Sequence, residues 1–223
     1  MDPAKGEAVD KENQNTTTSS DSGITPEELL TMQLDRARIP KLYRGVTWET
    51  FELYLNITKT AAGEKLWERL SRFRDWRGDD GEGSLVFLTG RPGCGKTHVA
   101  VATLRRWIEA GKRGATFLVT GEFLADMKNG FRDGTAQGIM RRAQGDSLLV
   151  IDDLGSEMAT DWVRDSMYML VNYRLNHMKP TVITSNLRLG EIAETYHSRL
   201  ASRLAGEFAI DMNILPDHRL VKS

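Results

Sequence analysis

Short uninterrupted apolar runs alternate along this chain with longer stretches in which apolar residues recur every three or four positions. Uninterrupted runs are typical of strands buried on both faces of a parallel sheet, and the second spacing is typical of amphipathic helices. The runs predict strands at residues 84–89, 115–120, 147–151, 181–184 and 207–212. The periodic stretches predict helices at residues 57–77, 97–110, 121–131, 135–144, 160–177, 189–194 and 196–205. This alternation predicts an α/β domain with a parallel sheet covered on both faces.

The N-terminal region departs from this pattern. Residues 1–24 are polar and lack aromatics, so we expect a disordered tail, with a partner-binding peptide as the alternative. A typical helix start follows, because Thr25 can act as the N-cap, Pro26 fits the first position and Glu28 the third, and this helix should end near residue 37. The expected division is a tail at 1–24, a helix and linker at 25–56, and the main domain at 57–223.

Three aromatic residues follow that helix. Tyr43, Trp48 and Phe51 lie within residues 39–51, where Pro40 blocks a helix on its N-terminal side. The aromatic side chains indicate a segment that packs onto the main domain. They are compatible with an anchoring strand and with one wall of an adenine pocket.

Composition narrows the class of protein. The 223 residues have room for one domain, and 40% hydrophobic residues suffice for a core. A net charge of −1 and a pI near 6.4 mean that any contact with DNA must come from a local patch. The single cysteine excludes an internal disulfide framework and fits a reducing cytosol, so we expect a cytoplasmic protein. No apolar run approaches the roughly 20 residues that span a bilayer, and residues 1–22 lack the apolar core of a secretory signal.

A phosphate-binding loop follows the first predicted strand. The pattern Gly-x4-Gly-Lys-[Ser/Thr], between a strand and a helix, is that of a P-loop. Its residues are Gly90, Arg91, Pro92, Gly93, Cys94, Gly95, Lys96 and Thr97. The glycines let backbone N–H groups surround a phosphate, and the helix start adds its positive dipole end. Lys96 is expected to neutralise the β- and γ-phosphates, and the Thr97 hydroxyl to ligate Mg²⁺.

Polar residues at the ends of two later strands complete the pattern of an ATPase. The third strand ends in Asp152 and Asp153, a Walker B pattern that places Asp152 in the shell of Mg²⁺. Asp153 is the candidate base that polarises the attacking water, and a solvated loop acid is the alternative. After the fourth strand, Asn186 is the candidate that orients this water, while Thr184 and Ser185 are expected to satisfy backbone groups.

Arginines near the end of the chain suggest a contribution from a neighbouring subunit. Arg199 and Arg203 are four residues apart and so share one face of a predicted helix. Such a face is usually solvated, but in an ATPase an arginine can reach the γ-phosphate held by a neighbour. Arg219 could sense the nucleotide of its own subunit or cap the terminus.

Taken in order, these motifs resemble those of the DnaC/DnaI helicase loaders, whose close relatives are the IstB-type transposition helper ATPases of the AAA+ class. The segments that carry the resemblance are Tyr43-Arg44, Thr47 to Phe51, GRPGCGKTH at 90–98, VIDDLGSE at 150–157, KPTVITSN at 179–186 and SRLASRL at 198–204. The resemblance covers roughly residues 39–220.

The resemblance implies an AAA+ three-layer sandwich whose five parallel strands are ordered 5-1-4-3-2, with a short helical N-terminal extension. No small helical lid is expected, since few residues follow the last strand. The resemblance also implies that residues 90–98, with His98 the last of them, bind ATP, and that Thr97 and Asp152 bind Mg²⁺. Asp153 becomes the catalytic acid/base, Asn186 the first sensor, Arg203 the arginine finger with Arg199 as an assistant, and Arg219 the second sensor.

The implied function is an ATP-dependent loader of a hexameric replicative helicase in DNA replication. It would bind single-stranded DNA, self-associate into a spiral or ring and hydrolyse ATP slowly. The alternatives are an IstB-like transposition helper and an ATP-gated DNA-binding switch with negligible hydrolysis. Lys128, Arg132, Arg141 and Arg142 are the candidates for phosphate contacts, unless they form a solvated basic face.

Three features depart from the family pattern. The region ahead of Tyr43 has no cysteines and hence no zinc module, which leaves only the helix at 25–37 to contact a helicase. Trp48 stands where the family often has Phe. Asp153 stands where AAA+ proteins at large usually have Glu, but Asp is usual in the resembling family and suggests slow turnover that depends on the oligomer.

Overall fold

A parallel sheet forms the middle layer of the protein. The computed structural model describes residues 24–55, 60–76, 84–206 and 208–218. Within them, five strands pair in the order β2-β3-β4-β1-β5, and every pairing is parallel. Their bounds are β1 Leu85–Thr89, β2 Ala115–Val119, β3 Leu148–Leu154, β4 Thr181–Ser185 and β5 Phe208–Asp211. This order is 5-1-4-3-2 read from the other edge, so the predicted topology is confirmed.

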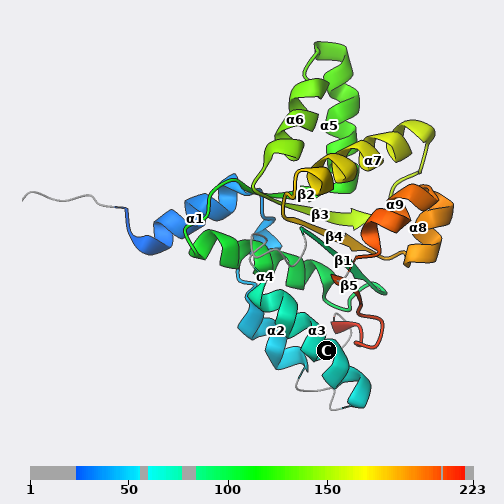
Figure 1. The fold of residues 1–223 in the computed structure, drawn as a ribbon. Helices are drawn as coiled ribbons and strands as arrows, with labels where there is room; N and C mark the ends of the chain where they lie inside the picture. The colour runs from blue at the N-terminus through cyan, green and yellow to red at the C-terminus, as the bar shows by residue number, and fades with distance from the viewer. Residues whose placement is uncertain (1–23, 56–59, 77–83, 207, 219–223) are drawn as a thin grey trace, which may run out of the picture.

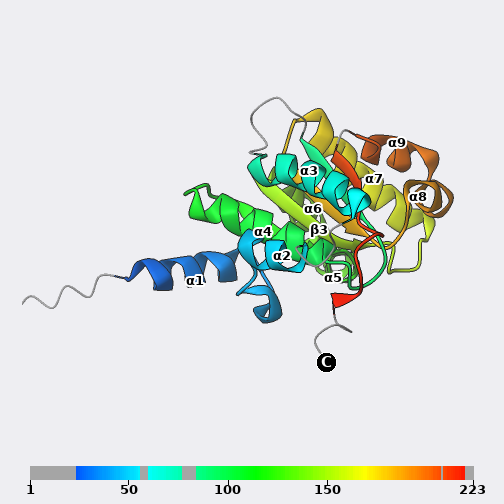
Figure 2. The same ribbon diagram turned by 90° about the horizontal axis from the view of Figure 1, so that it is seen from below.

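Helices cover both faces of this sheet, as Figures 1 and 2 show. One layer contains α1 Pro26–Arg36, α2 Trp48–Leu55, α3 Ala61–Asp75 and α4 Lys96–Glu109. The other contains α5 Thr120–Asp133, α6 Ala136–Gly145, α7 Asp161–Asn176, α8 Leu189–Thr195 and α9 Ser198–Leu204. Because side chains alternate along a strand, Val86 and Leu88 join the core under the first layer, while Leu85 and Phe87 join the core under the second. Two-sided burial explains the uninterrupted apolar runs.

Most predicted elements are present, with shifted ends. β3 is longer than expected and continues to Leu154, which pairs with Ser185 after an irregularity that follows Ile151. The helix start at Thr25 is confirmed, since its hydroxyl accepts from the Glu28 amide while the Glu28 carboxylate accepts from the Thr25 amide. The predicted tail lies, except for residue 24, outside the described residues, and so does the start of the helix predicted at 57–77.

The segment at 39–51 is not a strand. It forms a short 3-10 helix at Lys41–Tyr43 and then α2. Thr47 and Thr50 explain the helix, because each backbone N–H donates to the hydroxyl of the other residue at the start of α2. Trp48 and Phe51 then turn inward and are almost completely buried against the first layer. The aromatics therefore anchor this segment as a helix.

No helix in the part of the chain that the structure describes is long and apolar enough to cross a membrane.

A buried arginine ties the helices to the sheet at the edge where the strands begin. Arg174 of α7 is fully buried. Its guanidinium donates to the Thr181 hydroxyl at 2.9 Å and to the carbonyls of Ala143 at 2.8 Å, Gln144 at 3.3 Å, Asp146 at 2.9 Å and Pro180 at 2.6 Å. Burial lowers the pKa of Arg174 to about 10, and the nearby Asp146 carboxylate partly opposes this shift by raising it. The side chain is therefore charged at neutral pH. One cation thus satisfies acceptors from the end of α6 and the starts of β3 and β4.

Replacing Arg174 with Met should therefore unfold the protein more easily. The apolar side chain leaves several buried acceptors unpaired, and we expect a loss of about 3–5 kcal/mol in the free energy of unfolding. Thermal denaturation should show a melting temperature lower by about 10 °C. The control is Arg141→Met at an exposed site on α6, which should change stability by less than about 0.5 kcal/mol. Equal melting of the two variants would show that Arg174 does not hold these segments.

Candidate nucleotide-binding site

The P-loop joins β1 to α4 at the edge where the strands end. Gly93 and Gly95 have left-handed backbones with φ of 79° and 94°, which residues with a Cβ rarely adopt. Gly95 is the N-cap of α4, and a Cβ at this position would lie 2.8 Å from the Phe51 ring. Glycine therefore serves two purposes here: it allows the turn, and it lets α2 pack directly against the loop.

The Lys96 ammonium lies inside this loop, with 7% of the residue exposed. It donates to the carbonyls of Gly90 at 2.7 Å and Arg91 at 3.0 Å. It also donates to the side-chain oxygen of Asn186 at 2.9 Å. The cation is thus held between the P-loop and the tip of β4, where phosphates could replace the carbonyls as its partners.

The Asp152 carboxylate lies beside Lys96 at the end of β3. It accepts from the Thr97 hydroxyl at 3.0 Å and from the Thr184 hydroxyl at 2.6 Å. Burial raises the pKa of Asp152, and the two hydroxyl bonds oppose that shift. Sequence reasoning placed Asp152 and Thr97 together, and the structure does so as well.

Asp153 has a strained backbone at the next position. Its φ of 59° is left-handed, which is uncommon for a residue other than glycine. The Thr184 hydroxyl accepts from its N–H at 2.9 Å, and Ser156 donates its hydroxyl to the Asp153 carbonyl at 2.9 Å. The Asn186 amide donates to its carboxylate at 3.0 Å. Asp153, Asn186 and Lys96 therefore form one hydrogen-bonded chain across β3, β4 and the P-loop.

Thr184 has a larger part than its sequence suggested. It satisfies a backbone group, as expected, but it also donates to the Asp152 carboxylate. Ser185 does only the first, since its hydroxyl donates to the Leu154 carbonyl and accepts from the Leu187 amide at 3.0 Å. The only signal in the sequence for Thr184 was a hydroxyl two residues before the predicted sensor Asn186.

These groups face a cleft of about 730 Å³ whose other wall comes from the N-terminal segment. That wall consists of Leu42, Tyr43, Gly45, Val46, Thr50 and Phe51. His98 in α4 fixes it in place, because its Nε2 lies 3.0 Å from the Thr50 hydroxyl and 3.1 Å from the Thr47 carbonyl. Of the two interpretations of residues 39–51, the pocket wall agrees with this geometry.

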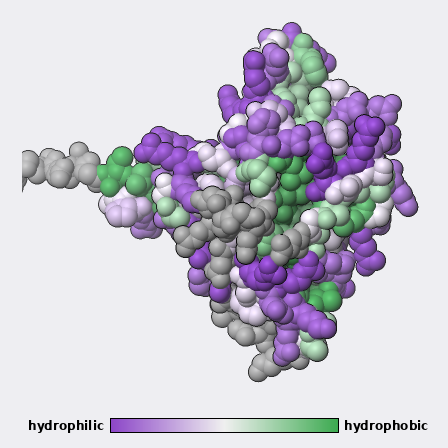
Figure 3. Space-filling view, viewed as in Figure 1, coloured by the Kyte–Doolittle hydropathy of each residue, from purple (hydrophilic) through white to green (hydrophobic). Residues whose placement is uncertain are grey.

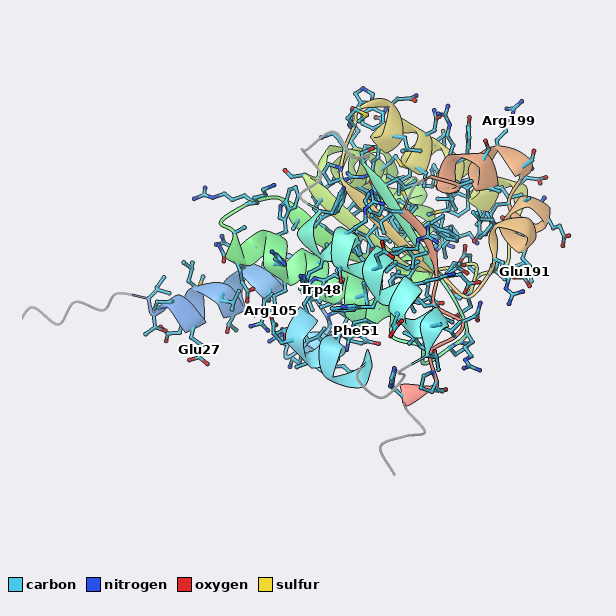
Figure 4. All side chains as sticks on the ribbon, turned by 60° about the horizontal axis from the view of Figure 1, so that its bottom comes forward. Glu27, Trp48, Phe51, Arg105, Glu191 and Arg199 are labelled. Carbon is cyan, nitrogen blue, oxygen red and sulfur yellow. The ribbon has the colours of Figure 1, made fainter. Side chains whose placement is uncertain are left out.

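The two arginines predicted on α9 do not line this cleft. Arg199 and Arg203 are exposed on α9 and line a separate surface pocket with Tyr168, Ser198 and Ser202. Figure 4 shows Arg199 on the opposite side of the molecule from Trp48 and Phe51. Arg219 lies outside the described residues, and the residue before it, His218, lines the cleft.

The donor set fits Mg²⁺ bound together with a polyphosphate. A carboxylate and a hydroxyl, Asp152 and Thr97, are oxygen ligands of the kind that Mg²⁺ prefers, and the ion usually takes its other ligands from phosphates and water. Consistently, the described residues contain no group of three His, Cys, Asp or Glu side chains that could hold a metal by themselves.

A P-loop lies beside two acids at the tip of β3 and an amide at the tip of β4, on a sheet ordered 2-3-4-1-5, and this arrangement defines a P-loop fold of the AAA+ class. Comparison with known families agrees, since the family described as IstB-like ATP binding protein matches residues 69–205, more than half of the chain. The chain belongs to this family.

Individual relatives include two helicase loaders. The replicative helicase loader DnaI of Bacillus subtilis is 26% identical over 137 residues, which are 60% of this chain and 44% of the relative. The replicative helicase loader DnaC of Escherichia coli K12 is 25% identical over 127 residues, or 56% of this chain and 51% of the relative. The chain thus spans about half the length of the curated relatives it matches.

A solved structure shares the fold. The crystal structure of the DnaC helicase loader superposes with a TM-score of 0.61 at 26% identity, covering 78% of this chain and 99% of that one. The family and the arrangement of the sheet predicted from the motifs are therefore confirmed.

Replacing Thr184 with Val tests whether this hydroxyl positions the two acids. We expect ATP hydrolysis to slow by about 10- to 100-fold, because a hydrogen bond to a charged group contributes about 1.5–3 kcal/mol. ATP affinity, measured by calorimetry, should change much less than the rate. Thr184→Ser keeps the hydroxyl and should restore most of the rate. Thr103→Val is the packing control, since that buried hydroxyl donates to the Val99 carbonyl of its own helix. If Thr184→Val hydrolyses ATP at the wild-type rate, the Thr184 hydroxyl does not position the two acids for hydrolysis.

Proposed function

We propose that this protein is an ATP-dependent loader of a replicative helicase, which binds Mg-ATP in the cleft and hydrolyses it slowly. The proposal rests on one combined observation. The protein is similar to the DnaC loader over 99% of that structure, and hydrogen bonds connect its Lys96, Asn186 and Asp153 in series. Binding of ATP is the activity for which the family is named. Hydrolysis and the helicase partner are the proposal.

The side chains divide the work of hydrolysis. Lys96 neutralises the phosphates, and Thr97 with Asp152 would hold Mg²⁺, which would offset negative charge on the phosphates. Asp153 accepts a proton from the attacking water, and Asn186 orients that water through the amide that now bonds Asp153. Asp153 is a shorter acid than Glu, so its reach toward water is limited and turnover should be slow.

Arg203 acts on the nucleotide of a neighbouring subunit, with Arg199 as its assistant. The proposal is supported by the exposure of both residues on α9 and by their separation from the cleft of their own chain (Figure 4). An arginine supplied from another subunit stabilises charge in the transition state of phosphoryl transfer. Self-association into a spiral or ring would complete each site.

Single-stranded DNA is proposed to contact the α5–α6 pair, which stands away from the sheet in Figure 1. Phe131 of α5 is 61% exposed and meets the Trp162 ring edge-on, with centroids 5.9 Å apart. The Lys128 ammonium lies 5.5 Å from the centroid of the same Trp162 ring. An exposed aromatic between basic residues is a typical stacking platform for bases, and Arg132, Arg141 and Arg142 on the same helix pair add exposed positive charge.

Removing this ring should weaken the binding of DNA. We expect Phe131→Ala to lose about 1–3 kcal/mol in affinity for a fluorescent oligothymidine, because that is the contribution of stacking on one base. Phe131→Trp should retain the affinity, and Met169→Ala, at an exposed apolar site on α7, should not change it. Arg132→Gln should instead lower the slope of affinity against salt by about one. If Phe131→Ala binds as the wild type does, the platform lies elsewhere.

The contact with the helicase is assigned to α1. This helix projects from the body in Figures 1 and 2, and Figure 3 shows hydrophobic atoms at its free end. Ile24, Leu29 and Met32 are 60%, 47% and 41% exposed. Two of these residues also have a local role, since Ile24 and Leu29 occupy the positions of a hydrophobic staple at the start of the helix. A short apolar face on a projecting helix is a means of docking in a partner's groove.

Capture of a purified replicative helicase, compared with capture of a purified transposase, tests the function. We expect the helicase to bind in the presence of ATP and the double variant Leu29→Glu, Met32→Glu to lose it, with ATP binding intact. Glu27→Lys at an exposed polar site on α1 is the matched control. Binding of the transposase but not of the helicase would instead favour an IstB-like transposition helper, which the family match also supports. Binding of DNA and ATP without measurable turnover would favour an ATP-gated switch.

A further inference from the structure

The segment that follows β5 lies across the P-loop. We call residues 212–218 the C-terminal strap; Figure 2 shows it in red, leaving the sheet. The Met212 amide donates to the Thr89 carbonyl at 2.7 Å, where β1 ends. The Asn213 side chain then accepts from the Arg91 amide at 2.8 Å. The Leu215 carbonyl accepts two bonds from the Arg91 guanidinium, at 3.0 and 2.8 Å. The strap is therefore attached to the P-loop itself and must respond to any movement of that loop.

Asp217, near the end of the described strap, places its carboxylate against the phosphate-binding loop. The His218 amide donates to the Gly93 carbonyl at 3.1 Å, and His218 lines the cleft. The preceding residue is Asp217, and a Cβ at Gly93 would lie 1.8 Å from its Oδ1 and 2.1 Å from its Cγ. The carboxyl group thus packs directly on the Gly93 backbone, where only a glycine leaves it room.

This placement opposes the chemistry of the loop. Successive backbone N–H groups in a P-loop form a concave nest that attracts anions, and phosphates bind there. The Asp217 carboxylate at Gly93 therefore adds negative charge to the loop in which those phosphates would bind. Two unit charges about 4 Å apart repel by roughly 1 kcal/mol in water and by several times more near a protein surface.

We propose that Asp217 is an autoinhibitory group, which holds the cleft in a state of low nucleotide affinity until the strap shifts. The inference rests on the proposed function in taking the cleft as the ATP site. Because the loop surrounds the phosphates that ADP and ATP share, the carboxylate weakens both nucleotides to a similar extent. Binding of a nucleotide moves the P-loop, and the bonds of Arg91 and Gly93 to the strap transmit that movement to residues 212–218.

Titration calorimetry of the full chain with ADP and with a non-hydrolysable ATP analogue tests this proposal. We expect Asp217→Asn to bind both nucleotides about tenfold more tightly than the wild type at low salt. The gain should shrink as added salt screens the charges. Asp217→Glu keeps the charge and should bind weakly, as the wild type does. Asp165→Asn is the matched control, since it makes the same change in net charge at an exposed site on α7 away from the cleft.

Two results overturn the proposal, and they are distinguishable. If the wild type binds nucleotide, Lys96→Ala does not, and Asp217→Asn binds no more tightly than the wild type, the autoinhibitory contact is wrong and the proposed ATP site stands. If neither the wild type nor Asp217→Asn binds nucleotide, both are wrong. Thermal melting of each nucleotide-free variant shows whether a change in affinity is a change in folding.

Discussion

The Asp152 carboxylate joins the parts of this molecule that its chemistry requires. It receives one hydroxyl from the start of α4 and another from the end of β4, and it stands at the end of β3. A buried carboxylate is costly unless its oxygens are hydrogen-bonded, so these partners must be in place whenever the protein is folded. The P-loop helix and two neighbouring strands are thereby aligned before any nucleotide arrives.

The same sheet is held differently at its two edges. Where the strands begin, the Arg174 guanidinium satisfies acceptors from three segments, with all its partners inside the protein. Where the strands end, Lys96 and Asp153 use partners that a nucleotide and water can replace. A rigid edge therefore supports an edge whose hydrogen bonds can be exchanged, and ligands of open α/β sheets bind at this second edge, where the strands end.

The cleft depends on segments from both ends of the described chain. One wall comes from residues 42–51, anchored by buried Trp48 and Phe51 and by the bonds of His98. The strap from 212 to 218 closes the other side of the P-loop. Within one chain, the arginines of α9 face elsewhere. The described molecule thus holds the groups of an ATP-binding site, and its proposed arginine finger would act on another copy.

The succession of strands and helices along the chain, the P-loop and the acids of β3 could all be predicted from the sequence, because each depends on local spacing: uninterrupted apolar runs for the buried strands and glycines at fixed intervals for the loop. The sequence left open whether residues 39–51 form a strand or a pocket wall, because aromatic residues favour a strand. The structure decides for a helix, which begins with the reciprocal bonds of Thr47 and Thr50. The sequence did not identify Arg174, the donation from Thr184 to Asp152 or the contact of Asp217 with Gly93. Each of these joins residues from different elements, and such contacts exist only after parallel strands far apart in the chain have been brought side by side.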